Sequence, residues 1–241
     1  MRVSRIHTTQ ILVEGCDVQL SDETAHYLGK VLRVRPGDTL SLFNGEQGEF
    51  LASILSVDKK SITVKLVQAV PCHADPRLPI HLGLGLSRGE RMDYAIQKAT
   101  EAGVSSITPL LTERCEVKMR DDRKENRLQH WERIAISACE QSGRCVVPVV
   151  HSPQTLDSWL ERPRDGLSFV LDHRAAASFP PAESPAAITL LIGPEGGLSE
   201  AEIDQANARN FKSLRLGPRV LRTETAPVVA ISLAQHLWGD Y

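Results

Sequence analysis

Short apolar runs alternate with polar segments along the chain, and their spacing changes near residue 78. In the first part, apolar residues at helical spacing follow Ser21, whose side chain can cap a helix, and continue to Arg33. Three strand-like runs come next, over Thr39–Phe43, Glu49–Val57 and Ser61–Ala69. One helix with several short strands is typical of a small β-barrel-like domain, which we predict for residues 1–71.

After a proline-containing linker at residues 71–76, strand-like and helix-like segments alternate. Strands are predicted over Ile80–Leu86, Ile107–Leu111, Val146–Val150, Phe169–Leu171, Ile188–Ile192 and Ser213–Leu216. Helices are predicted from Ser87 to Gly103 and over Asp122–Ser142, Leu156–Arg162, Glu200–Arg209 and Pro227–Leu237. Such alternation favours a parallel sheet covered by helices on both faces, so we predict an α/β protein whose second domain spans residues 77–241.

Polar residues mark where several of these helices begin. Ser87-Arg-Gly-Glu90 and Ser199-Glu-Ala-Glu202 both have the Ser-x-x-Glu form of a capping box. Thr225 precedes Pro227 and could cap the last helix. We therefore expect the helices to start at these residues, with Gly103 ending the first of them.

The composition is that of an ordinary globular protein. Of 241 residues, 41% are hydrophobic and 24% are charged, and the net charge is -2 with a pI of about 6.5. This balance argues against indiscriminate phosphate binding, so an RNA partner would have to meet an arranged face. The sequence has no run of about 18 apolar residues and no apolar leader, which predicts a cytoplasmic protein without a membrane partner.

The five cysteines give no sign of a disulfide framework. They are odd in number, widely spaced and free of a Cys-x-x-Cys pair: Cys16, Cys72, Cys115, Cys139 and Cys145. We therefore predict reduced thiols and no metal site.

Two glycine-rich loops carry the strongest functional signal, and they lie at Leu191–Leu198 (Leu-Ile-Gly-Pro-Glu-Gly-Gly-Leu) and Leu216–Ala226 (Leu-Gly-Pro-Arg-Val-Leu-Arg-Thr-Glu-Thr-Ala). Each follows a strand-like run and precedes a helix, which places both at the carboxyl edge of a parallel sheet, where such sheets bind ligands. Either loop alone could be a tight structural turn, but together they could close on one flat molecule. The nearby Glu195 would repel phosphate, so an uncharged or cationic ligand fits better.

Other nucleotide-binding patterns are absent. Gly83-Leu-Gly-Leu-Ser-Arg-Gly89 resembles a dinucleotide fingerprint, but its third glycine is displaced by one residue and its first two lie in a predicted strand. Arg219 and Arg222 flank the second glycine loop, where a guanidinium could orient a planar base or stabilise charge that develops on it. A further group of basic residues near the ends of early elements is either an RNA contact or a solvated face.

Four parts of the chain carry a resemblance to a known family: His26–Arg33, Arg88–Glu101, Ala138–Arg144 and the pair of glycine loops. In this order and over nearly the full length, they resemble the bacterial ribosomal RNA small subunit methyltransferase E family of the SPOUT superfamily. The resemblance implies an N-terminal PUA-like RNA-binding β-barrel and a C-terminal domain with a deep trefoil knot that binds S-adenosylmethionine. It also implies a homodimer that methylates N3 of a uridine in 16S ribosomal RNA of the small subunit.

The resemblance further implies roles for individual residues. Arg222 and Glu224 are the expected catalytic residues: Arg222 to stabilise charge on the uracil ring, and Glu224 either as a proton acceptor or in a structural role, so the general base stays unassigned. The expected cofactor-binding residues are Leu171, Ile192, Gly193, Glu195, Gly196, Gly197, Leu216, Gly217, Leu221 and Thr223. The expected RNA contacts are Arg33, Arg88, Lys98, Arg114, Gln141, Arg144 and Arg219. Two alternatives remain at this point: a SPOUT methyltransferase with a ribose or another base as target, and a non-catalytic RNA-binding or ribosome assembly protein.

Overall fold

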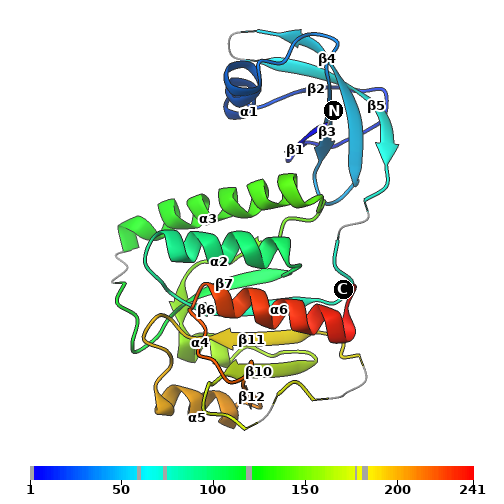
Figure 1. Ribbon diagram of the computed structural model, residues 1–241. Helices are drawn as coiled ribbons and strands as arrows, with labels where there is room; N and C mark the ends of the chain where they lie inside the picture. The colour runs from blue at the N-terminus through cyan, green and yellow to red at the C-terminus, as the bar shows by residue number, and fades with distance from the viewer. Residues whose placement is uncertain (1–2, 59–60, 73–74, 118–120, 177, 181–183) are drawn as a thin grey trace. The chain divides into compact units, whose positions relative to one another are not determined.

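The computed structural model describes residues 3–58, 61–72, 75–117, 121–176, 178–180 and 184–241. The chain forms two compact units (Figure 1). The first comprises Met1–Asp75 together with Cys139–Val147, and the second comprises Pro76–Ala138 and Pro148–Tyr241. The first unit thus includes a segment from within the range predicted for the second domain. Residues 73–74 of the predicted linker lie outside the described residues.

The first unit is built on a five-stranded mixed sheet. Its strands are β1 (Ser4–His7), β2 (Asp17–Gln19), β3 (Thr39–Phe43), β4 (Glu49–Val57) and β5 (Ile62–Val70), in the order β1-β3-β4-β5-β2. β1 pairs in parallel with β3, and the other pairs are antiparallel. The pattern predicted β3, β4 and β5 within one residue. It missed the two edge strands, which are too short to show a period-2 alternation.

The predicted helix after Ser21 is present but not uniform. It begins as α1 (Asp22–His26), where the Ser21 side chain accepts a hydrogen bond from the Thr24 N–H. It continues as a π-helix, η1 (Tyr27–Leu32), and ends at Arg33, which has a left-handed backbone with φ 54°. Ala25 and Leu28 of this segment are buried in the apolar core of the sheet. The apolar spacing predicted this burial, but it did not predict the wider helical turn.

The second unit contains the predicted parallel sheet. Its strands are β6 (Ile80–Gly85), β7 (Ser106–Leu111), β8 (Val149–Val150), β9 (Gln154–Thr155), β10 (Leu167–Leu171), β11 (Ile188–Ile192) and β12 (Lys212–Leu214). The order is β12-β10-β11-β6-β7-β8, β9 pairs with β7, and every pair is parallel. The α/β class is therefore confirmed.

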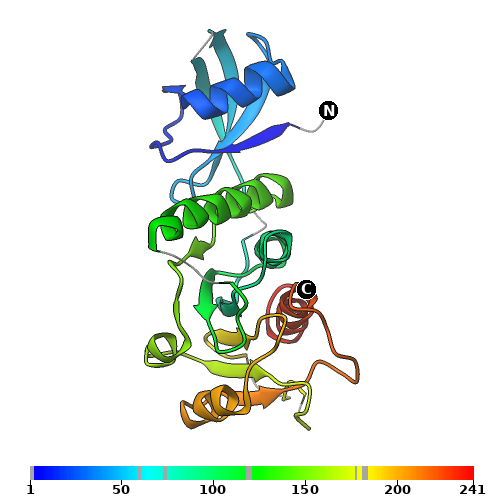
Figure 2. The same ribbon diagram turned by 90° about the vertical axis from the view of Figure 1, so that its left-hand side faces the viewer.

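Helices cover both faces of this sheet: α2 (Glu90–Glu101), α3 (Asp121–Ser142), α4 (Leu156–Leu160), α5 (Glu200–Ala208) and α6 (Thr225–Trp238). Figure 2 shows α2 (teal) and α6 (red) on one side of the strands, and α4 (yellow-green) and α5 (orange) on the other. Between these layers, all five residues of β11 are buried. A strand covered on both faces has this continuous apolar sequence rather than an alternating one.

Two of the three predicted helix caps are wrong. The helix predicted to start at Ser87 begins only at Glu90, after Gly89 with φ 42°, and no side chain caps it. Ser87 is instead buried, and its hydroxyl faces the Gly85 carbonyl. Thr225 lies inside the first turn of α6 rather than before it. The loop before α2 thus continues further than its motif indicated, with Ser87 held beside Gly85 and Thr223, whereas α6 begins earlier than its motif indicated.

The prediction that all cysteines are reduced is also wrong. Cys72 and Cys145 form a disulfide within the first unit, although 73 positions separate them in the sequence. The fold brings their Cα atoms to 6.3 Å, and no local spacing could reveal that proximity. Cys16, Cys115 and Cys139 are free thiols. No helix among the described residues is long and apolar enough to cross a membrane.

Candidate active site

The two glycine loops meet at one cavity of about 510 Å³ in the second unit. Residues after β10, β11 and β12 line it, in the segments 171–174, 192–198 and 214–224, at the carboxyl ends of these three neighbouring strands. This is where open parallel sheets bind ligands, and the volume is that of a small-molecule pocket. The sequence placed both loops at this edge of the sheet, and the structure brings them together.

Most of the expected cofactor-binding residues line this cavity. They are Leu171, Ile192, Gly193, Glu195, Gly196, Gly197, Leu216, Leu221 and Thr223; Gly217 is not among the lining residues. The expected catalytic residues Arg222 and Glu224 also line it. Asp172 and His173, which follow the expected Leu171 after β10, line it too. The sequence analysis did not select Arg174 and Arg215, which line it as well. Both lie just after β10 or β12, so the strand-end rule that found the glycine loops could have found them too.

The first glycine loop is fixed by close backbone packing. A Cβ atom on Gly193 would lie 2.8 Å from the backbone of Gly197 and Leu198, and one on Gly85 of β6 would lie 2.4 Å from Pro194 N. The Gly197 N–H donates to the Pro194 carbonyl at 2.8 Å, and Gly197 has φ +69°. Only glycine permits this close approach and this left-handed backbone.

The helix after this loop starts at the predicted capping box. The Ser199 side chain accepts a hydrogen bond from the Glu202 N–H at 3.3 Å. The Glu202 carboxylate in turn accepts one from the Ser199 N–H at 2.8 Å. Both donors at the start of α5 are therefore satisfied, and the loop enters the helix in a defined direction.

A buried hydroxyl joins the two glycine loops. The Thr223 side chain, only 8% exposed, donates to the Gly193 carbonyl at 2.9 Å. The same hydroxyl lies 3.3 Å from that of Ser87, at the end of β6. One small side chain thus holds the arginine-bearing loop against the loop after β11, and it places the neighbouring Arg222 and Glu224 at the cavity.

Glu195 supplies a negative charge at the cavity. Burial alone would raise the pKa of this carboxyl, but hydrogen bonds, foremost from the Arg88 N–H, hold its pKa below the ordinary value. The Arg91 guanidinium adds a hydrogen bond and an ion pair at 3.2 Å. The carboxylate therefore stays ionised at neutral pH, with its charge engaged by Arg91 and by the Arg88 N–H.

The arginines around the cavity differ in whether a carboxylate pairs with them. The Arg174 guanidinium pairs with Asp172 at 3.1 Å and with Glu200 at 2.6 Å. Arg219 and Arg222 are exposed on the second glycine loop, and no hydrogen bond or ion pair to another described residue engages their guanidinium groups. These two side chains are thus available to a substrate that approaches the cavity.

The expected RNA contacts do not form one cluster. Arg114 and Arg219 line the cavity. Arg88 is exposed and pairs with Glu116 at 2.8 Å, and Lys98 pairs with Glu101 at 2.8 Å. The remaining three belong to the first unit: Arg33 and Gln141 are exposed, whereas Arg144 is only 3% exposed. A buried Arg144 side chain presents no surface to RNA, and we do not retain it as a contact.

Comparison with known families agrees with this geometry. The model of the RNA methyltransferase domain matches residues 74–235, and that of the RNA methyltransferase PUA domain matches residues 20–67. The fold and site therefore define an RNA methyltransferase, with an N-terminal PUA-like domain on a mixed sheet and a C-terminal parallel-sheet domain.

Curated relatives identify the family more closely. The ribosomal RNA small subunit methyltransferase E of Buchnera aphidicola (subspecies Acyrthosiphon pisum) is 37% identical over 92% of this chain and 88% of that protein. The enzyme of the same name from Bacillus subtilis is 30% identical over 95% of this chain and 93% of that protein. The chain belongs to the ribosomal RNA small subunit methyltransferase E family, as the sequence motifs indicated.

Two solved relatives hold a cofactor. A ribosomal RNA small subunit methyltransferase E from Neisseria gonorrhoeae, bound to S-adenosylmethionine, is 36% identical with a TM-score of 0.93 over the whole of both chains. A protein from Legionella pneumophila, in complex with the same cofactor, is 39% identical with a TM-score of 0.95, again over both whole chains. Both relatives therefore share the fold of this chain over its whole length, and both hold S-adenosylmethionine.

Proposed function

We propose that this protein transfers the methyl group of S-adenosylmethionine to N3 of a uridine in 16S ribosomal RNA of the small ribosomal subunit. The observation that carries the proposal is the convergence of both glycine loops on one cavity, beside the unpaired Arg222 guanidinium. The names and bound cofactor of the relatives support the same chemistry.

The residues at the cavity suit S-adenosylmethionine. Leu171, Leu216 and Leu221 offer apolar walls for its adenine ring, and the loop after β11 brings backbone groups to the cavity. The Glu195 carboxylate is charged and complements a cationic ligand. Gly197 leaves open space where a side chain would stand. We propose that these residues, with the other lining residues of the predicted set, hold the cofactor.

In this mechanism the bound cofactor supplies an electrophilic methyl group. The protein holds the uracil ring in line with it, and such positioning can lower a barrier by roughly 7–11 kcal/mol. N3 of uridine carries a weakly acidic proton, and its loss spreads negative charge onto the two ring oxygens. Arg222 stabilises that charge through its free guanidinium. Glu224 is our candidate for the proton acceptor because it lines the same cavity.

We propose that RNA approaches along an arranged basic surface rather than through overall charge, since the net charge is -2. Arg114 and Arg219 would contact nucleotides next to the target base because they line the cavity. Arg88, Lys98, Arg33 and Gln141 would contact RNA further away.

A second copy of the chain completes the proposed enzyme. α2 and α6 pack against each other. On these helices Tyr94, Leu233 and Leu237 are 48%, 39% and 47% exposed. Apolar side chains exposed on adjacent helices support a homodimer formed through this surface. We place the enzyme in the cytoplasm, where its ribosomal substrate is assembled.

We also propose that the second unit is knotted. The first unit's described strands, by contrast, form an open sheet with β1 and β2 at its edges rather than the predicted barrel. In support of the knot, the chain leaves β12 at the edge of the sheet, and Thr223 then lies at Gly193 beside β11. It continues into α6, which packs against α2 and β11. A chain that returns from the edge to the centre in this way can thread the loop after β11, an exception to the usual rule against threading.

Primer extension along 16S ribosomal RNA tests the proposed function. We expect small subunits that lack the modification, incubated with the protein and S-adenosylmethionine, to show a new stop at one uridine, because N3 methylation blocks the Watson–Crick edge. Mass spectrometry of the modified nucleoside then identifies the methylated atom. A methyl group on a ribose or another base would replace the proposed target, and binding of cofactor and subunits without any transfer would favour a non-catalytic role.

Replacement of Thr223 by valine tests how the two loops are joined. Valine keeps the shape of threonine but leaves the Gly193 carbonyl without its buried donor, which costs about 1–3 kcal/mol. We expect the Kd for S-adenosylmethionine, measured by calorimetry, to rise roughly tenfold. Thr225→Val is the matched control, since among the described residues no hydrogen bond joins the Thr225 side chain to the loop after β11. Equal affinities in both variants would exclude the proposed role of this hydroxyl.

A further inference from the structure

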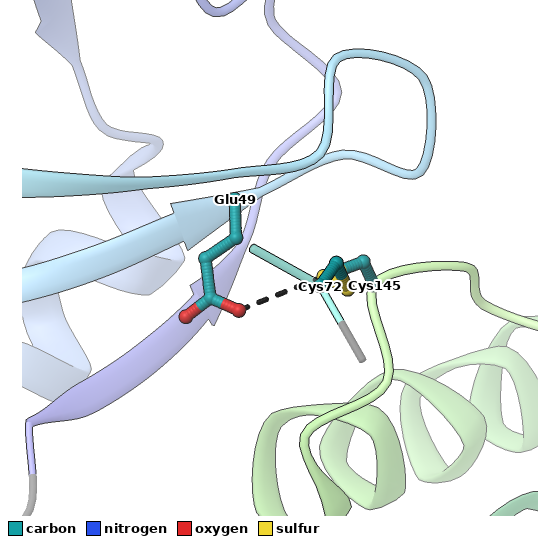
Figure 3. A group of neighbouring side chains, drawn as sticks. All are labelled: Glu49, Cys72 and Cys145. Atoms are coloured by element: carbon teal, nitrogen blue, oxygen red, sulfur yellow. Dashed lines mark hydrogen bonds between the residues drawn. A yellow bond between two sulfur atoms is a disulfide. The ribbon is translucent and has the colours of Figure 1, made fainter. Parts of the chain in front are cut away.

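The Cys72–Cys145 disulfide lies among charged groups of the first unit (Figure 3). The Glu49 carboxylate points toward the sulfur atoms, with Oε2 3.6 Å from Cys145 Sγ. Asp75 Oδ2 lies 3.4 Å from Cys72 Sγ. The Arg5 guanidinium, which pairs with Glu49 at 2.9 Å, lies 3.6 Å from Cys145 Sγ.

These neighbours suit the reduced form better than the oxidised one. Disulfide sulfur atoms carry no hydrogen, so each carboxylate oxygen faces sulfur lone pairs and gains nothing. After reduction, the Cys145 thiol has Glu49 as an acceptor, and the Cys72 thiol has Asp75. The Arg5 guanidinium lies 3.6 Å from Cys145 Sγ, the sulfur that receives the electron pair when Cys72 is attacked.

The two sulfur atoms also differ in how far solvent can reach them. Cys72 is half-buried, whereas Cys145 is only 2% exposed. An external thiolate can therefore attack Cys72 Sγ, and the electron pair of the broken S–S bond moves to Cys145 Sγ, next to Arg5. A second thiol then attacks the mixed disulfide and releases Cys72. Two thiols are oxidised to one disulfide, and the protein gains two S–H groups.

We propose that Cys72 and Cys145 form a reversible thiol–disulfide switch, driven by the cellular glutathione couple, that locks residues 139–147 onto the first unit. Without the disulfide, hydrogen bonds still hold this segment. Arg5 donates to the carbonyls of Cys139 at 2.6 Å and Arg144 at 3.1 Å. The N–H groups of Cys145 and Val146 donate to Asp75 at 3.1 and 2.9 Å. Reduction therefore loosens the segment without releasing it.

The nearest third cysteine does not compete for either partner. Cys139 packs in the same cluster, but burial raises the pKa of its thiol to about 11. It stays protonated at neutral pH, and a protonated thiol is a poor nucleophile in disulfide exchange. Exchange is therefore confined to Cys72 and Cys145.

Redox titration of the full-length protein tests the switch. The protein is equilibrated in buffers that range from reduced to oxidised glutathione, and differential alkylation with mass spectrometry measures the state of each cysteine. We expect Cys72 and Cys145 to convert together within this range. The oxidised protein should melt about 10 °C higher, because the bond closes a long loop. Hydrogen exchange at Cys145 and Val146 should be faster after reduction.

Matched variants assign the effect to this pair. Cys72→Ser/Cys145→Ser should abolish the shift in melting temperature between the two buffers, whereas Cys16→Ser, at an exposed free thiol, should retain it. If the double variant does not fold, the alkylation pattern and the melting temperature of the unmodified protein across the glutathione buffers still test the proposal. Five free thiols at every glutathione ratio, or a bond that no ratio reduces, would overturn the proposal. Stoichiometric zinc retained by the reduced protein would do so too, since Glu49, Cys72 and Cys145 would then form a metal site.

Discussion

Arg222→Ala is expected to lower the rate constant for methyl transfer by about 10²–10³-fold, the usual cost of removing one donor that stabilises developing negative charge. The affinity for S-adenosylmethionine should change little, because the guanidinium is exposed and is tied to no other described residue, so its loss leaves the loops of the cavity in place. Single-turnover transfer of labelled methyl groups to small ribosomal subunits gives the rate, and calorimetry gives the cofactor Kd.

A second arginine provides the control for this variant. Arg209 is exposed at the end of α5 and does not line the cavity, so Arg209→Ala removes the same charge without touching the site. Its rate should match that of the unmodified protein. If Arg222→Ala lost cofactor affinity and methyl transfer to the same extent, Arg222 would be a cofactor-binding residue and not a catalytic one.

Gly197→Val is expected to raise the Kd for S-adenosylmethionine by at least roughly 100-fold and to abolish methyl transfer. Gly197 lines the cavity with φ +69°, and apart from Gly197 and its two chain neighbours no atom of the described residues lies within 4 Å of where its Cβ would stand. A branched side chain would therefore project into the open space that the cofactor needs, and it would also strain the loop. Equilibrium binding of S-adenosylmethionine measures the effect directly.

Strain alone could also weaken binding, and Gly37→Val controls for it. Gly37 has φ +91° and open surroundings as well, but it belongs to the first unit, away from the residues that line the cavity. Both variants should lose similar stability on thermal unfolding, while only Gly197→Val should lose cofactor affinity. Full affinity in Gly197→Val would mean that this loop does not form the pocket.

The sequence predicted regular elements well wherever the local pattern was long enough. β3, β4 and β11 have the predicted bounds, and the parallel sheet follows from the alternation of strands and helices. Short edge strands such as β1 gave no signal, since a few residues cannot show a period. The wider turn of η1 was also invisible, because its apolar spacing resembles that of an ordinary helix over one turn.

The candidate site was predictable for a similar reason. Loops that follow parallel strands must meet at one edge, so the two glycine loops could be placed together before the structure was known. Contacts between side chains far apart in the sequence could not be predicted in this way. Ser87 looked like a helix cap but packs beside Thr223, and Arg144 looked like an RNA contact but is buried. The disulfide belongs to the same class, since its two cysteines meet only after folding.

The segment 139–147 has a consequence for the order in which the protein folds during synthesis. The first unit contains the first 75 residues of the chain, but it also needs this later segment. Phe43, fully buried in the folded protein, packs in a cluster with Cys139 and Cys145. On the translating ribosome this N-terminal unit therefore stays incomplete until residue 147 has emerged, by which point β6, α2, β7 and α3 have already been made. A fragment cut at residue 75 is expected to expose Phe43 and to aggregate, although it contains every strand of its sheet.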